Sequence, residues 1–129
     1  MKFSVDKHEK YVVLKLNESK LTNDNAPKLK SEFILLNSEG HCNIVLDLSA
    51  VKQCEDSQDL SSLLFGDRLC KKANGLFIVT GINPVVAKIL EMSNLDQSLT
   101  IVAKVDEATD LIFMEEIEKE LLGSFDQSN

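Results

Sequence analysis

Residues 43–80 read NIVLDLSAVKQCEDSQDLSSLLFGDRLCKKANGLFIVT, and this stretch decides the fold of the chain. It opens on NIVLDL and closes on LFIVT, two short apolar runs that are typical of strands buried on both faces. Between the two runs, residues 57–73 are mostly helix formers, and Asn74-Gly75 supplies a helix stop. A strand, a helix and a second strand in this order predict a parallel or mixed sheet covered by helices.

The flanking sequence extends this pattern in both directions. Residues 3–5 and 11–16 alternate as two strands joined by a short turn, and residues 100–103 form a last short strand. Further helices are expected to start near Ala26, Pro84 and Asp106, with Asn83 as the N-cap of the second of these. The expected order is β-β-α-β-α-β-α-β-α. We therefore predict an α/β domain in which about four helices flank a mixed central sheet of four to five strands, with the first strand as an antiparallel edge.

Length and charge restrict the class of protein. The chain has 129 residues, enough for one domain, which we place at 1–123 and follow with a flexible tail at 124–129. Twenty-one acidic against fourteen basic side chains give a net charge of -7. This charge disfavours binding to nucleic acid or to an anionic membrane surface. No apolar run is long enough to span a bilayer, and the first residues lack a secretory signal, so a cytoplasmic location is expected.

The sequence offers little that could perform catalysis. The three cysteines and two histidines match no metal-binding spacing, and an odd cysteine count in a cytoplasmic protein does not indicate a disulfide framework. No phosphate-binding glycine loop and no nucleophile with a nearby base can be recognised. We therefore expect no enzyme activity, no cofactor and no metal.

Three stretches carry a resemblance to a known family: IVLDLSAV at 44–51, CEDSQDLSSLLFG at 54–66, and KKANGLFIVTGINPVVAKILEMSNLDQ at 71–97. In order and spacing they resemble a STAS domain of the anti-sigma factor antagonist (anti-anti-sigma factor) family, over nearly the whole chain. Members have a D-L-x-x-V link after a strand, a D-S-[ST]-G motif that opens a helix, and a later helix resembling xxPxVxxxLxxxGL. The matching residues here are Asp47, Leu48 and Val51 in the link, Asp56 and Ser57 in the motif, and Pro84, Val86, Leu90 and Leu95 in the last helix and its exit.

The chain departs from the family pattern at three places. Gln58 and Asp59 stand where the motif has a hydroxyl residue and a glycine, and one extra residue separates Val51 from Asp56. Asn94 stands where the family commonly has glycine, and asparagine tolerates the left-handed backbone conformation nearly as well.

The resemblance implies a regulatory role for Ser57. In the family, the matching serine is phosphorylated by a partner anti-sigma factor that is also a serine kinase, and phosphorylation releases the partner. The plainer interpretation is that Ser57 or Asp56 only caps the helix that follows. Ser61 and Ser62 are rival acceptors of the phosphate.

The angular positions on this helix suggest a partner-binding surface. At 100° per residue, Ser62, Phe65, Gly66, Leu69, Cys70 and Ala73 form a small and apolar face suited to packing on the sheet. Ser57, Leu60, Ser61, Leu64, Asp67, Arg68 and Lys71 fall on the other side. We predict that Asp56, Ser57, Gln58, Leu60, Ser61, Leu64 and Arg68 contact the partner, with Leu60 and Leu64 exposed below Ser57.

Two other features have plainer interpretations. In the last helix, Phe113, Met114, Ile117 and Leu121 share one apolar face, and the acidic residues around them are expected to serve solubility. Asp47 at a strand end is expected to cap the following turn.

Two functions remain open alongside the antagonist role. STAS-like domains also serve as small subunits of lipid-transport ATPase complexes, and a small enzyme is a third alternative. The oligomeric state is not fixed by the sequence.

Overall fold

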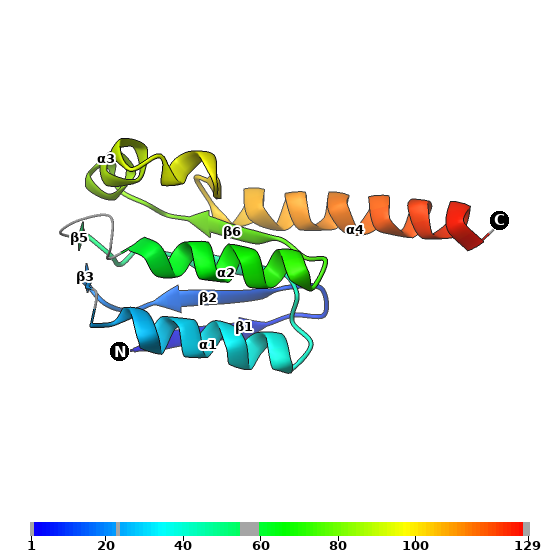
Figure 1. Cartoon of the computed structure of the whole chain (residues 1–129), viewed down its shortest axis with the longest axis horizontal. Coiled ribbons are helices and arrows are strands. Elements are labelled where there is room, and N and C mark those ends of the chain that lie inside the picture. Colours follow the sequence, from blue (N-terminus) through cyan, green and yellow to red (C-terminus); the bar gives the residue numbers. More distant parts are fainter. Residues whose placement is uncertain (1, 23, 55–59, 128–129) are drawn as a thin grey trace.

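The computed structural model describes residues 2–22, 24–54 and 60–127 (Figure 1). Along these residues the elements are β1 (Phe3–Lys7), β2 (Val12–Leu16), β3 (Lys20–Leu21), α1 (Ala26–Ser38), β4 (Ile44–Asp47), β5 (Gln53–Cys54), α2 (Ser61–Lys72), β6 (Phe77–Thr80), α3 (Pro84–Met92), a 3-10 turn (Leu95–Gln97), β7 (Thr100–Val102) and α4 (Val105–Gln127).

The main sheet has five strands in the order β1-β2-β4-β6-β7. β1 pairs antiparallel with β2, whereas β2, β4, β6 and β7 are parallel neighbours. Within the described part of the chain, four helices accompany this mixed sheet. The predicted class, strand order along the chain and antiparallel edge strand are therefore confirmed. A second sheet of two strands, β3 and β5, was not predicted, because runs of two residues carry no readable periodicity.

Side chains of the central strands alternate between two separate layers of core. Ile44 and Leu46 of β4 pack with α1 and α2 residues such as Phe33 and Leu63. Val45, which lies between them in β4, packs on the opposite face with Ala108 and Ile112 of α4. Successive residues of a strand point to opposite faces, so a strand covered on both sides must be apolar throughout. This arrangement is the physical reason for the continuous apolar run at 44–46.

Helix α4 does not pack on the sheet through the apolar face that stands out in its sequence. The apolar face made by Phe113, Met114, Ile117 and Leu121 is exposed, and the helix contacts the sheet through Ala108 and Ile112 instead. The C-terminal half of α4 projects beyond the end of the sheet (Figure 1). The helix also starts at Val105 rather than at Asp106, and it continues through Gly123 to Gln127, into the segment where the sequence predicts a tail.

Candidate functional site

The turn that follows β4 lies at the carboxyl ends of the parallel strands. At the end of β4, the Asp47 carboxylate accepts a hydrogen bond of 2.9 Å from the Ser49 backbone N–H, so Asp47 caps the turn as predicted. Leu48 N–H donates to the Thr80 carbonyl at the end of β6, also at 2.9 Å. Leu48 and Val51 are buried. The D-L-x-x-V link is therefore a fixed turn at the carboxyl edge of the sheet.

The start of α3 holds the same turn from the other side. The Asn83 side-chain oxygen accepts from Val86 N–H at 2.9 Å, which confirms the predicted N-cap. The side-chain amide of Asn83 also donates to the carbonyls of Val51 and Lys52, at 3.3 and 2.9 Å. One asparagine thus begins α3 and ties it to the chain that enters β5. Cys54, at the end of β5, is buried.

Helix α2 begins at Ser61, on the side of the sheet toward which the β2 and β6 arrows point (Figure 1). The residue at its N-cap position is Leu60, whose side chain makes no capping hydrogen bond. Asp56, Ser57 and Gln58, to which the sequence assigned phosphorylation and partner contact, lie outside the described residues. Their flanks are described, with β5 ending at Cys54 and the chain resuming at Leu60.

The prediction that Leu60 and Leu64 are both exposed is wrong for Leu60. Leu60 has no exposed surface, whereas Leu64 is half-buried and packs against the same core. Leu60 precedes α2, so a helical projection that starts at Ser57 places it incorrectly. Ser61 and Arg68 are exposed. Ser61, Leu64 and Arg68 follow the spacing i, i+3 and i+7, which brings them to one side of the helix.

The residues of α2 that face the sheet also differ from those expected from the spacing of 100° per residue. Leu63 and Asp67 are buried, Phe65 and Leu69 are only partly buried, and Ala73 is exposed. The Asp67 carboxylate forms an ion pair of 2.8 Å with Lys71, one turn later.

Gly66 and Cys70 face the core as predicted, and a Cβ at Gly66 would lie 2.6 Å from the Phe77 ring. Burial raises the pKa of the Cys70 thiol to about 12, which makes it a poor nucleophile.

The two alternative phosphate acceptors, Ser61 and Ser62, differ in how far they are buried. Ser62 has no exposed surface, and its hydroxyl has no hydrogen-bond partner among the described residues. A kinase cannot reach this hydroxyl while α2 is packed on the sheet. Ser61 is exposed at the first position of α2 and remains accessible.

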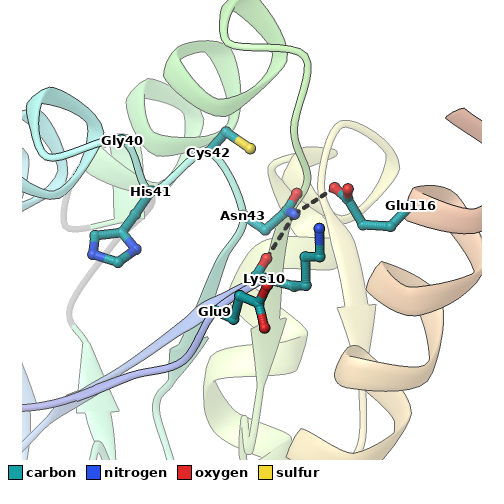
Figure 2. Close-up of a pocket in the computed structure, with 7 residues that line it drawn as sticks. All are labelled: Glu9, Lys10, Gly40, His41, Cys42, Asn43 and Glu116. Atoms are coloured by element: carbon teal, nitrogen blue, oxygen red, sulfur yellow. Dashed lines mark hydrogen bonds between the residues drawn. The ribbon is translucent and has the colours of Figure 1, made fainter. Parts of the chain in front are cut away.

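A polar pocket of about 200 Å³ lies at the opposite, amino-terminal end of the strands (Figure 2). At its centre, the Asn43 amide donates to the Lys10 carbonyl at 2.9 Å and to the Glu116 carboxylate at 3.0 Å. The Asn43 side-chain oxygen accepts from Leu76 N–H at 2.8 Å. The hydrogen bond from Asn43, aided by Lys119, lowers the pKa of Glu116. The polar atoms of the Asn43 side chain are all used in these hydrogen bonds. Sequence reasoning therefore missed a structural link between distant segments rather than a catalytic site.

The described residues contain no group of His, Cys, Asp or Glu side chains that could hold a metal ion. Among the same residues, no helix combines the length and apolar character that crossing a bilayer requires.

A parallel sheet with an antiparallel first strand, a fixed turn at its carboxyl edge and a helix starting beside that turn define the class of this protein. The chain belongs to the STAS domain family: the family model described as "Mlab, STAS domain" matches residues 3–103. The mixed five-stranded sheet with its helices is the STAS fold of anti-sigma factor antagonists.

Solved structures of other proteins share this fold. A Thermotoga maritima protein, TM1081, solved as a candidate anti-sigma factor antagonist, is 26% identical with a TM-score of 0.73, over 85% of this chain and 93% of its own. An anti-sigma factor antagonist from Mycobacterium paratuberculosis is 21% identical with a TM-score of 0.73, over 86% and 92%. The Bacillus cell fate determinant SpoIIAA in its phosphorylated form is 18% identical with a TM-score of 0.62, over 86% and 99%. No curated protein matches this chain closely enough to count as a relative.

Proposed function

We propose that this chain is a non-catalytic protein-binding module that acts as an anti-sigma factor antagonist in the cytoplasm. Its partner in this proposal is an anti-sigma factor that is also a serine kinase. The observation that carries the proposal is the arrangement at the carboxyl edge of the sheet. There, Asp47 and Asn83 fix the chain that leads into residues 55–59, and the exposed side of α2 begins directly after them. The likeness to TM1081, at 26% identity, supports the same role.

The partner surface is centred on the start of α2. Ser61 and Arg68 are exposed there, and Leu64 lies between them as a partly exposed apolar contact. A binding surface of this kind combines a small apolar centre with polar groups around it. Leu60 belongs to the core in this proposal, and Asp56, Ser57 and Gln58 complete the surface from the preceding segment.

Ser57 is the phosphate acceptor in the proposal. Its sequence neighbours Glu55, Asp56 and Asp59 are acidic. A phosphate would add roughly -1.5 to -2 charges at pH 7 next to three carboxylates. An apolar or acidic partner surface would then meet concentrated negative charge, and the complex would dissociate.

The first experiment identifies the partner. Tagged protein is purified from its native host, and the proteins that elute with it are identified by mass spectrometry. An ATPase of the anti-sigma kinase type supports the proposal. Its absence from the eluate, under conditions that keep the tagged protein folded, contradicts it.

The second experiment tests the switch with the purified partner and ATP. Phosphate should appear on the wild-type protein and on Ser61→Ala, but not on Ser57→Ala. Ser57→Asp should bind the partner at least about tenfold more weakly at an unchanged melting temperature. Phosphate found on Ser61 instead would move the switch to the start of α2.

A second candidate function is the small subunit of a lipid-transport ATPase complex. The observation that favours it is the description of the matching family, which names Mlab rather than an antagonist. Gln58 and Asp59, in place of the hydroxyl and glycine of the antagonist motif, point in the same direction. Transporter subunits in the eluate, with no phosphate transferred to Ser57, would establish this function.

A further inference from the structure

A groove of about 350 Å³ lies beside α4, at the end of the sheet away from the start of α2. Its apolar lining comes from Leu111 and Met114 of α4 and from Leu76, which precedes β6. Thr100 of the edge strand β7 and two acidic residues, Glu115 and Glu118, complete the lining. The groove therefore combines a place for an apolar side chain with two negative charges.

An exposed apolar strip continues from this groove along α4. It consists of Met114, Ile117 and Leu121, whose spacing of three and four residues puts them on one side of the helix. Between 58% and 66% of each of these residues is exposed, and this side of α4 faces away from Ala108 and Ile112. Scattered exposed apolar residues are common, but a continuous strip joined to a groove is typical of a docking surface.

The negative charge around the groove indicates the charge of the molecule that binds there. Residues 105–123 carry seven acidic side chains and one basic one: Asp106, Glu107, Asp110, Glu115, Glu116, Glu118, Glu120 and Lys119. Lys119 is turned toward the body of the domain, where its ammonium donates to the Asn74 carbonyl. Among the residues that the structure describes, no cation pairs with Glu115 or Glu118. An occupant that neutralises them must bring its own positive charge.

We propose that a cationic amphipathic helix of a partner protein docks along α4. Its apolar side lies on the strip and places one residue in the groove, while its Lys or Arg side chains meet Glu115 and Glu118. A second copy of this chain fits poorly, because two α4 helices side by side would bring like charges together. This surface is separate from the proposed partner surface at the start of α2.

The test uses a synthetic helical peptide of roughly 18 residues, long enough to form a helix, with Leu at helical spacing and Lys elsewhere. A matched peptide carries Glu in place of Lys. Fluorescence anisotropy with the full chain should give at least about tenfold tighter binding of the Lys peptide. Higher salt should weaken that binding, because screening reduces the attraction between exposed charges.

Two double variants locate the binding. Met114→Ser with Glu118→Lys should weaken binding of the Lys peptide at least about tenfold, at an unchanged melting temperature, because both side chains are exposed. The control, Met92→Ser with Glu91→Lys, makes the same chemical changes on the exposed side of α3 and should leave the affinity within about twofold. Equal loss in both variants, or equal binding of both peptides, overturns the proposal. So does a wild-type dimer in sedimentation that the Met114 variant converts to monomer.

Discussion

The side-chain amide of Asn43 lies 3.0 Å from the carboxylate of Glu116 and joins the start of β4 to the middle of α4 (Figure 2). The same amide holds the turn before β2 through the Lys10 carbonyl, and its oxygen holds the chain entering β6 through Leu76 N–H. One buried side chain therefore connects three strands and a helix at the amino-terminal end of the sheet.

Asn43→Ala should lower the free energy of unfolding by about 1–3 kcal/mol, because it leaves the Leu76 N–H and the Lys10 carbonyl without these partners. Urea denaturation measures this change. The matched control is Asn17→Ala, which removes an exposed hydrogen bond to Ser4 and should cost less than about 0.5 kcal/mol. Equal effects of the two substitutions would show that the Asn43 network does not hold the elements together.

The lowered pKa of Glu116 makes a prediction about pH. A carboxyl group whose pKa is lower in the folded state stabilises the fold above its unfolded pKa, and this contribution is lost as the pH falls through the folded pKa. Wild type should therefore be more stable than Glu116→Gln at neutral pH. The difference in melting temperature should shrink as the pH falls below the ordinary glutamate value of about 4.3. A difference that stays constant down to strongly acidic pH would contradict this assignment.

Gly75 and Gly123 should respond in opposite ways to substitution by alanine. A Cβ at Gly75 would lie 1.9 Å from the Cys42 carbonyl oxygen, whereas a Cβ at Gly123 meets nothing within 4 Å. Gly75→Ala should destabilise the fold by about 3 kcal/mol or more, since backbone must move to relieve the overlap. Gly123→Ala should stabilise α4 by up to about 1 kcal/mol. Thermal unfolding of the two variants checks both signs, and a neutral Gly75→Ala would show that this close approach is not required.

Substituting alanine for Leu60 should destabilise the fold more than the same substitution at Leu64. Leu60→Ala removes a side chain with no exposed surface and should cost about 2–5 kcal/mol. Leu64→Ala removes a half-buried side chain and should cost less, while still weakening partner binding. Chemical denaturation of both variants, followed by titration of folded Leu64→Ala with the partner, separates packing from binding. If Leu64→Ala proves as costly as Leu60→Ala, Leu64 is a core residue and the partner surface excludes it.

The sheet was predictable from sequence because its central strands are covered on both sides. Burial on both faces leaves little choice but apolar residues at 44–46 and 77–79, and such runs are easy to recognise. Local backbone conformation was also predictable where a single side chain determines it. Asn83 caps α3, and Asn94 adopts a left-handed φ of 61° where the family commonly has glycine.

Packing partners were less predictable than elements. Among residues 105–123 of α4, whose burial the structure describes, only Ala108 and Ile112 are buried, and the larger exposed residues Phe113 and Ile117 dominate the helical periodicity. Helical periodicity identifies an apolar arc but does not say which arc meets the sheet. Likewise, Asn74-Gly75 was recognised as a helix stop, yet Asn74 takes the left-handed conformation, with a φ of 62°. Gly75 is needed for its close approach to Cys42, a contact between distant residues that local sequence does not reveal.

The two outermost strands, β1 and β7, restrict how another protein can join this sheet. β1 is largely exposed and carries the charged residues Asp6 and Lys7, while β7 has three residues only. Charged and short edge strands are poor templates for continuing a sheet with a strand from another molecule. In the complexes proposed above, recognition should therefore rest on side chains of the helices rather than on the hydrogen-bonding pattern of the backbone. Amino-acid substitutions on those helices can change which partner is bound without disturbing the sheet beneath.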